Sequence, residues 1–248
     1  MKHEVLTSVL VLVLSLTACG GGSSNDDWAK SDPSARAIST SSFDIQAAWT
    51  ALNNAPNSSQ LTVSGSCSGT YILSNSMAVQ SSLPTVVQNI VTVNRAYGAY
   101  VPCASPFENK SSVEKTDTYY FYVENNQQYQ NYYADDGTFV YKWRLPYAKF
   151  PNTSKVGDTG LIGIINKQYG YAQVGVQEWS YVIEEDTAYS VIFNLVVKHY
   201  TTTNTNYQST PVNTTEQFRY LVSQSNQMRL IQYDRVDADG FTIYGRLN

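Results

Sequence analysis

Short runs in which hydrophobic and polar positions alternate fill most of the chain after residue 60. The alternating residues are rich in β-branched and aromatic types, which is typical of strands with one buried face. The predicted strand segments are 60–74, 84–95, 115–125, 127–145, 161–170, 171–186, 187–202, 215–224, 227–236 and 240–248.

Turn residues separate these runs and suggest how they connect. Asp135-Asp136-Gly137 and Asp237-Ala238-Asp239-Gly240 are hairpin signals between two strand patterns. Helical patterns do not intervene, so we expect a mainly β fold, an antiparallel meander. The pattern leaves open whether the meander forms a sandwich or a partly open barrel. The run 187–202 is expected to be the longest apolar strand and to lie centrally.

One short N-terminal helix is predicted within STSSFDIQAAWTALNN, residues 39–54. Ile45, Ala48, Trp49 and Leu52 recur at helical spacing and form one apolar stripe. Ser41, with Asp44 three residues later, resembles a capping box at the start of this helix. We expect the helix to plug or cross the sheet, with Trp49 in the core.

The start of the chain shows a different pattern. Val5 to Leu16 is a nearly continuous apolar run of the length found in signal peptides, too short to span a membrane as a helix. Leu16-Thr17-Ala18-Cys19 follows it and resembles the lipobox of bacterial lipoproteins. The resemblance implies cleavage before Cys19, lipidation of Cys19 and membrane attachment through that lipid. Since Gly20 rather than aspartate follows, it also implies outer-membrane sorting in a host with two membranes.

The polar stretch after Cys19 divides the chain into three parts. Residues 1–18 are the predicted lipoprotein signal peptide. Residues 19–41, rich in Gly, Ser, Asp and Asn, are the predicted lipidated cysteine and flexible tether. Residues 42–248 are expected to form a single β-rich domain.

Composition narrows the possible partners. The net charge is −4 and the basic residues are scattered, so we expect no nucleic-acid partner. Outside the cytoplasm the two remaining cysteines, Cys67 and Cys103, would most simply pair as a disulfide, although two buried thiols are the alternative.

Catalytic motifs are weak. Gly65-Ser66-Cys67-Ser68-Gly69 matches a nucleophile elbow in spelling, but strand patterns lie on both sides and no helix follows. After signal cleavage His199 is the only histidine, so any triad would have to use it, and a histidine zinc site is excluded. We therefore predict no catalytic residues, no cofactor and no metal site.

Two acidic clusters deserve comparison with glycosidase and calcium sites. They are Glu184-Glu185-Asp186 and the group Asp234, Asp237 and Asp239. Paired carboxylates would serve hydrolysis only across one cleft, and the second cluster fails an EF-hand alignment because Arg235 and Arg246 occupy ligand positions. The tyrosines of 118–133 occupy both strand faces; they suit strands in general, and exposed ones would suit sugar or protein contacts.

The stretches 155–160 (KVGDTG) and 178–198 are similar to segments of uncharacterised bacterial lipoproteins. The leading hypothesis is a membrane-anchored envelope lipoprotein with a non-enzymatic β domain for partner binding or a structural surface role. One alternative is a lipocalin-like carrier of a lipid or other apolar ligand, possibly helix-plugged. The other is a glycan-binding or glycan-hydrolysing module.

Overall fold

A computed structural model describes residues 38–55, 57–66, 68–80, 88–100, 113–124, 127–135, 139–144, 150–203 and 206–247. Within these ranges, only the backbone is described at 54, 74–80, 88–100, 113–124, 127–135 and 142. The predicted signal peptide, Cys19, Cys67 and Cys103 lie outside the described residues. The side chains of the tyrosine run 118–133 do as well.

Strands dominate the described part of the chain, which confirms the mainly β prediction. After α1 (Ile45–Asn54) come β1 (Asn57–Gly65), β2 (Ser68–Gln80), β3 (Gln88–Tyr100), β4 (Val113–Glu124), β5 (Gln127–Asp135), β6 (Val140–Trp143), β7 (Thr159–Tyr169), β8 (Ala172–Thr187), β9 (Ser190–Tyr200), the 3-10 turn η2 (Tyr207–Ser209), β10 (Thr214–Ser223), β11 (Met228–Asp237) and β12 (Thr242–Leu247).

The strands pair antiparallel in chain order, as a meander does. In addition, β1 pairs with β12, so the hydrogen-bonded order of the described strands forms a ring. The strand pairing is shortest at β6, which pairs with β5 at three positions and with β7 at four. Of the two arrangements left open by the sequence, the strand order is that of a barrel.

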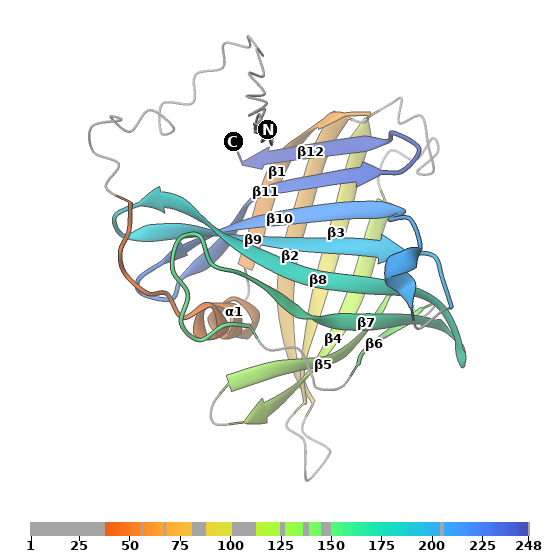
Figure 1. Cartoon of the computed structure of the whole chain (residues 1–248), viewed down its shortest axis with the longest axis horizontal. Helices are drawn as coiled ribbons and strands as arrows, with labels where there is room; N and C mark the ends of the chain where they lie inside the picture. The colour runs from red at the N-terminus through yellow and green to blue at the C-terminus, as the bar shows by residue number, and fades with distance from the viewer. Residues whose placement is uncertain are drawn as a thin grey trace, which may run out of the picture. The chain divides into compact units, whose positions relative to one another are not determined.

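Figure 1 shows β8–β12 crossing in front of β2–β4 at a steep angle. The predicted central place of 187–202 is wrong, because every strand of a ring has two neighbours. That run, β9, has 11 residues; β8, with 16, is longer but more polar.

The predicted helix is present, and its apolar stripe faces the core. Ile45 and Ala48 are fully buried, and Trp49 is 7% exposed. The cap differs from the prediction: Asp44, not Ser41, is the N-cap, and its carboxylate accepts a 2.8 Å hydrogen bond from the Ala47 N–H. A carboxylate directly before the first helical residue satisfies one of the free N–H groups of the first turn.

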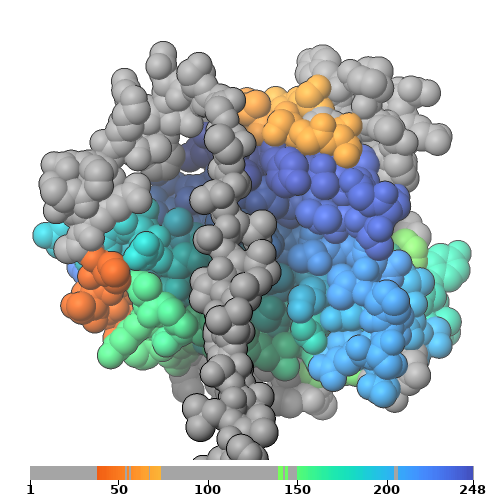
Figure 2. Space-filling view, turned by 45° about the horizontal axis from the view of Figure 1, so that its top comes forward, coloured from red at the N-terminus to blue at the C-terminus, as the bar shows by residue number. Residues whose placement is uncertain are grey.

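The helix and the segment that begins at Phe150 together fill one end of the barrel. The Trp49 ring stacks on Phe150 at 4.4 Å and meets Tyr220 edge-on at 5.8 Å. The backbones of Phe43 and Ser154 exchange two hydrogen bonds of 2.8 and 2.9 Å. In Figure 2 the helix segment (orange-red) and the residues after 150 (green) lie side by side at this end. We call α1 together with residues 150–154 the plug.

The two faces of β8–β12 differ in polarity. Inward side chains alternate with outward ones and join the plug in one apolar core that includes Trp179, Phe193, Phe218 and Tyr233. Outward positions on these strands are largely charged or polar, as on a sheet face that contacts water. Among the described residues, no helix is long and apolar enough to cross a membrane.

Candidate functional site

A chain of polar side chains interrupts the apolar inner wall at the end opposite the plug. Its members come from four neighbouring strands: Trp179 and Gln177 of β8, His199 of β9, Glu216 of β10 and Tyr233 of β11. We call these five residues the inner chain.

Strand register brings the inner chain together. Gln177 lies directly opposite His199. Glu216 lies opposite Arg235, two residues from Tyr233 on the same face of β11. Directly opposite and diagonal neighbours of adjacent strands are within reach of long side chains. The hairpins therefore place the five polar groups in one row on the inside of the barrel.

The hydrogen bonds of the inner chain converge on one carboxylate. The Trp179 indole N–H donates to Gln177 Oε1 at 3.0 Å. Gln177 Nε2 and His199 Nδ1 are 3.3 Å apart, and His199 Nε2 and Glu216 Oε2 are 2.7 Å apart. The Tyr233 hydroxyl donates to Glu216 Oε1 at 2.6 Å.

The indole and the carboxylate indicate which groups donate and which accept around the histidine. An indole can only donate, so Gln177 accepts through its amide oxygen and directs its NH₂ group towards His199. An ionised carboxylate can only accept, so His199 Nε2 donates a hydrogen bond to Glu216. In this arrangement His199 Nδ1 accepts from Gln177, and both ring nitrogens are thus engaged by protein groups.

Burial increases toward both ends of the inner chain. Its centre, the His199 side chain, is 28% exposed, whereas the Glu216 side chain is 10% exposed. Trp179 and Tyr233 are buried. The Tyr233 ring also stacks on Tyr71 of β2 with centroids 4.7 Å apart. The imidazole is thus the part of the chain closest to water.

An ion pair lies beside Glu216. The guanidinium of Arg235 donates to both carboxylate oxygens of Asp237, at 2.9 and 2.8 Å. Burial acts to lower the pKa of Arg235, but the hydrogen bond to Asp237 and the negative charge of Glu216 outweigh it and raise that pKa. Arg235 therefore remains charged and holds Asp237 in a bidentate pair.

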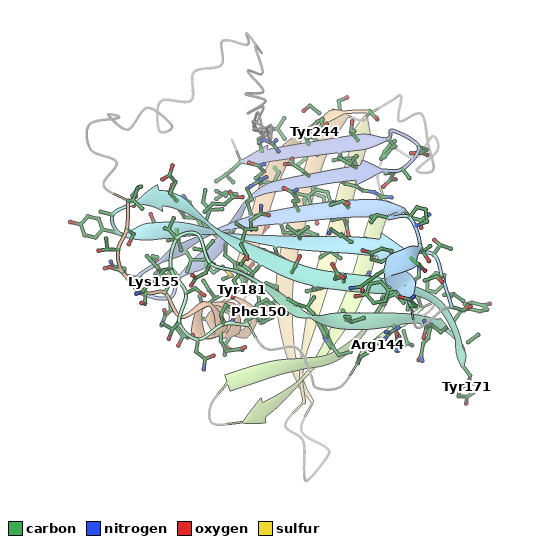
Figure 3. All side chains as sticks on the ribbon, viewed as in Figure 1. Arg144, Phe150, Lys155, Tyr171, Tyr181 and Tyr244 are labelled. Atoms are coloured by element: carbon green, nitrogen blue, oxygen red, sulfur yellow. The ribbon has the colours of Figure 1, made fainter. Side chains whose placement is uncertain are left out.

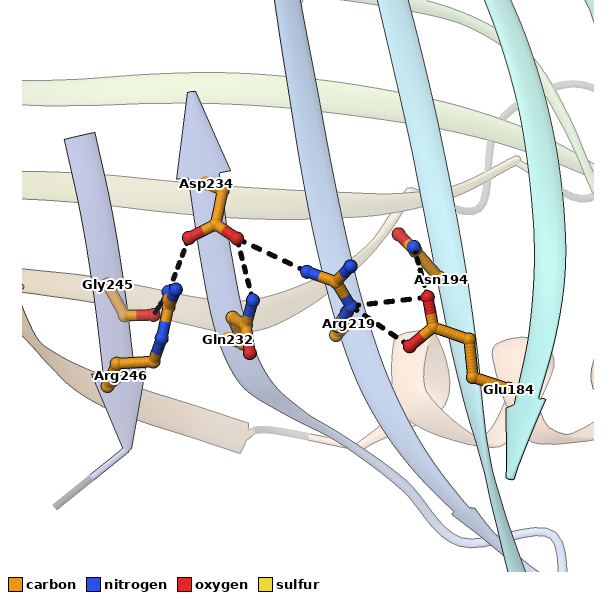
Figure 4. A network of polar contacts seen from close by, with 7 residues as sticks. All are labelled: Glu184, Asn194, Arg219, Gln232, Asp234, Gly245 and Arg246. Carbon is orange, nitrogen blue, oxygen red and sulfur yellow. Dashed lines mark hydrogen bonds and ion pairs between the residues drawn. The ribbon is translucent and has the colours of Figure 1, made fainter. Parts of the chain in front are cut away.

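The predicted acidic clusters belong mainly to the outside of the barrel. Arg219 lies between Glu184 and Asp234, with nitrogen–oxygen distances of 3.0 and 3.2 Å. Arg246 pairs with the other oxygen of Asp234, and Asn194 donates to Glu184 at 2.6 Å. Figure 4 shows this cross-strand row, which we call the outer network.

The remaining acidic residues do not complete a carboxylate or metal site. Asp186 accepts a hydrogen bond from Ser190, and Asp239 accepts one from the N–H of Phe241 in the last hairpin turn. Among the described residues, no group of three or more His, Cys, Asp and Glu side chains could hold a metal ion. The two clusters therefore supply cross-strand pairing and turns in this part of the chain.

The sequence analysis singled out His199 but missed Gln177 and Glu216. The alternation of side chains along each strand could have identified them, because Glu216 points to the same inward face as Phe218 and Tyr220 of β10. Gln177 is likewise in phase with the buried Trp179. A polar residue at a strand position that points inward with its apolar neighbours is expected to be a buried polar group.

Comparison with known proteins gives no match: no protein-family model, no curated protein and no solved structure is similar to this chain.

Proposed function

We propose that this chain is a lipid-anchored envelope protein whose barrel binds a small apolar or amphipathic molecule in its interior. The anchor would be the lipidated Cys19, and the resemblance of Leu16-Thr17-Ala18-Cys19 to a lipobox supports it. Two or more acyl chains would hold the protein stably at a membrane. The sorting rule favours the outer membrane.

The observation that carries the binding role is the inner chain on a wall that is largely apolar among the described residues. Burying polar side chains costs free energy that hydrogen bonds only offset, and apolar residues of similar size often serve stability equally well. Small-molecule sites, in contrast, are mostly apolar and contain a few convergent polar groups. The inner wall around Gln177, His199 and Glu216 has this composition.

The size of the ring also favours a carrier. An eight-stranded barrel already has room for its own side chains or for one small ligand. Here the described ring has twelve strands, and the plug places the buried Trp49 and Phe150 at one end. The other end has the inner chain in place of a plug among the described residues.

Native mass spectrometry of the full chain, purified from its own host in mild detergent, tests this proposal. We expect a non-covalent adduct of the size of a small molecule, released intact on collisional activation. The acyl groups on Cys19 would stay attached, because they are covalent, and would give the mass of the anchor separately. A bare polypeptide plus acyl mass, with no releasable molecule, would contradict the carrier role.

Partner binding is the second candidate, and exposed tyrosines favour it. Tyr169 is 61% exposed and Tyr171 is fully exposed at the β7–β8 hairpin. Figure 3 shows Tyr171 projecting from the tip of that hairpin. Tyrosine gives a large contact area at a low entropy cost. If Tyr171→Ser abolishes association with a cell-surface partner while the barrel remains empty, this candidate replaces the carrier.

A further inference from the structure

The inner wall contains a buried donor that has no acceptor among the described residues. The indole Nε1 of Trp143, on β6, has no hydrogen-bond partner among the described residues, and the residue is only 6% exposed. Most buried polar groups in folded proteins are bonded, so such an N–H calls for an explanation. A bound molecule that supplies an acceptor would account for it.

Trp179 is the natural comparison for Trp143. The two rings meet edge-on with centroids 5.1 Å apart, and both residues are 6% exposed. The Trp179 N–H has an acceptor, Gln177 Oε1, at 3.0 Å. The same wall therefore satisfies one indole and leaves its neighbour without a described protein acceptor.

The register places Trp143 next to the inner chain. Trp143 lies opposite Ile165 of β7, and Gly163 of the same strand lies opposite Trp179. Opposite residues share a face of the sheet. The buried Ile165 lies between Trp143 and Gln177 on this face, whereas Gly163, opposite Trp179, adds no side chain there.

The chemistry of the wall indicates a neutral ligand. The charges described on it already have partners: Arg235 holds Asp237, Glu216 accepts from Tyr233, and the Lys167 ammonium lies 3.9 Å from the Phe139 ring centroid. In the described part of the wall, a charged ligand would be buried without a further counter-charge, which is costly. A neutral oxygen can accept from an indole N–H without that cost.

We infer that the ligand is a neutral, largely aromatic molecule with a carbonyl or ether oxygen, and that this oxygen accepts the hydrogen bond of the Trp143 N–H. The inference rests on the proposed carrier function and deepens it. The flat rings of Trp143 and Trp179 provide the apolar contact, and the indole N–H provides the orientation.

Fluorene and 9-fluorenone form a matched probe pair, because they share one ring skeleton and only fluorenone has a carbonyl oxygen. The full chain in lipid nanodiscs is dialysed against each probe, with empty nanodiscs as the reference for partitioning into lipid. We expect fluorenone to bind about five- to tenfold more tightly than fluorene relative to that reference, the effect of one buried hydrogen bond.

Two tryptophan variants locate the hydrogen bond. Trp143→Phe should remove the preference for fluorenone. Trp49→Phe should keep it, because Trp49 also has a buried indole N–H without a described acceptor but lies in the plug. A preference that survives Trp143→Phe, or is lost in Trp49→Phe, overturns the inference. The wild-type comparison needs no variant and stands even where Trp143→Phe fails to fold.

The same titrations separate the two levels of the proposal. Equal binding of both probes to the wild type overturns the role of Trp143 and leaves the carrier function standing. Binding of neither probe above the empty nanodiscs overturns the carrier function, and the inference with it.

Discussion

The barrel has two polar rows, one on each face of the same strands, and they stabilise the fold differently. The hydrogen bonds of the inner chain converge on Glu216, whose side chain is 10% exposed. The outer network centres on Arg219, at 22%, and extends to Arg246, at 49%. Water can replace a lost partner in the outer network more readily than it can at Glu216 and the buried Tyr233. Removing a member of the inner chain should therefore lower the free energy of unfolding more than removing a member of the outer network.

The largest effect is expected from Glu216→Ala compared with Glu184→Ala. The first variant removes the acceptor of the buried Tyr233 hydroxyl and of His199, and should lower the free energy of unfolding by about 3 kcal/mol. The second removes an outer carboxylate and should cost about 0–1 kcal/mol. Urea unfolding of both variants measures the difference; equal losses would contradict the distinction between the two rows.

Two tryptophan variants sharpen the comparison within the inner wall. Trp179→Phe and Trp143→Phe remove similar ring volumes, but only the Trp179 N–H has a described protein acceptor. In the ligand-free protein, Trp179→Phe should therefore cost about 1 kcal/mol more than Trp143→Phe. Thermal unfolding of the two variants provides the test, and a larger loss for Trp143→Phe would show that its N–H is bonded in the free protein.

Salt should weaken the ion pairs of the outer network, which lie near water, more than the hydrogen bonds of the buried Glu216. Arg219→Ala should lower the unfolding free energy by about 0–1 kcal/mol at low salt, and this loss should shrink at about 1 M NaCl, where the screening length is about 3 Å. The loss in Glu216→Ala should stay nearly constant, because its partners are buried. Urea titrations at the two salt concentrations measure both, and a salt-insensitive Arg219→Ala would contradict the assignment.

Outside the barrel wall, the Tyr207 hydroxyl makes stability depend on pH. Burial and the hydrogen bond to Glu178 raise the pKa of this phenol to about 12, from an ordinary value of 10.0. The neutral phenol is thus favoured in the folded state. Its contribution to stability is complete below pH 10 and is lost as the pH rises through about 12.

Absorbance titration of tyrosinate measures this shift as the difference between the wild type and Tyr207→Phe. Glu178→Gln should move the Tyr207 transition to lower pH, since it removes the negative charge that helps to raise the pKa. An unchanged transition in Glu178→Gln would show that burial alone raises it.

Local sequence patterns were sufficient for most elements of the fold. Alternation identified the strands, and the stripe from Ile45 to Leu52 identified the helix. The closing pair of β1 with β12 was not predictable, because the periodicity of a segment does not name its partner. The helix cap was misassigned because Ser41 and Asp44 are both good capping residues, and only the geometry shows which accepts from Ala47.

The candidate site was only partly predictable, for a related reason. Glu216 and Gln177 could have been found from their phase within β10 and β8. The pairing of Gln177 with His199 could not, since an irregularity between Glu185 and Thr187 shifts the register of the β8–β9 hairpin. The contact of Trp143 with Trp179 likewise depends on how β6 pairs with β7.

The most direct measurement is an NMR titration of the ¹⁵N-tryptophan-labelled full chain with 9-fluorenone. The four tryptophans give four indole N–H signals, and Trp→Phe variants assign them. We predict that the Trp143 proton moves to higher chemical shift, as a new hydrogen bond requires, while the Trp49 signal in the plug stays in place. A stationary Trp143 signal, or a shift confined to Trp49, would contradict a ligand bound beside the inner chain.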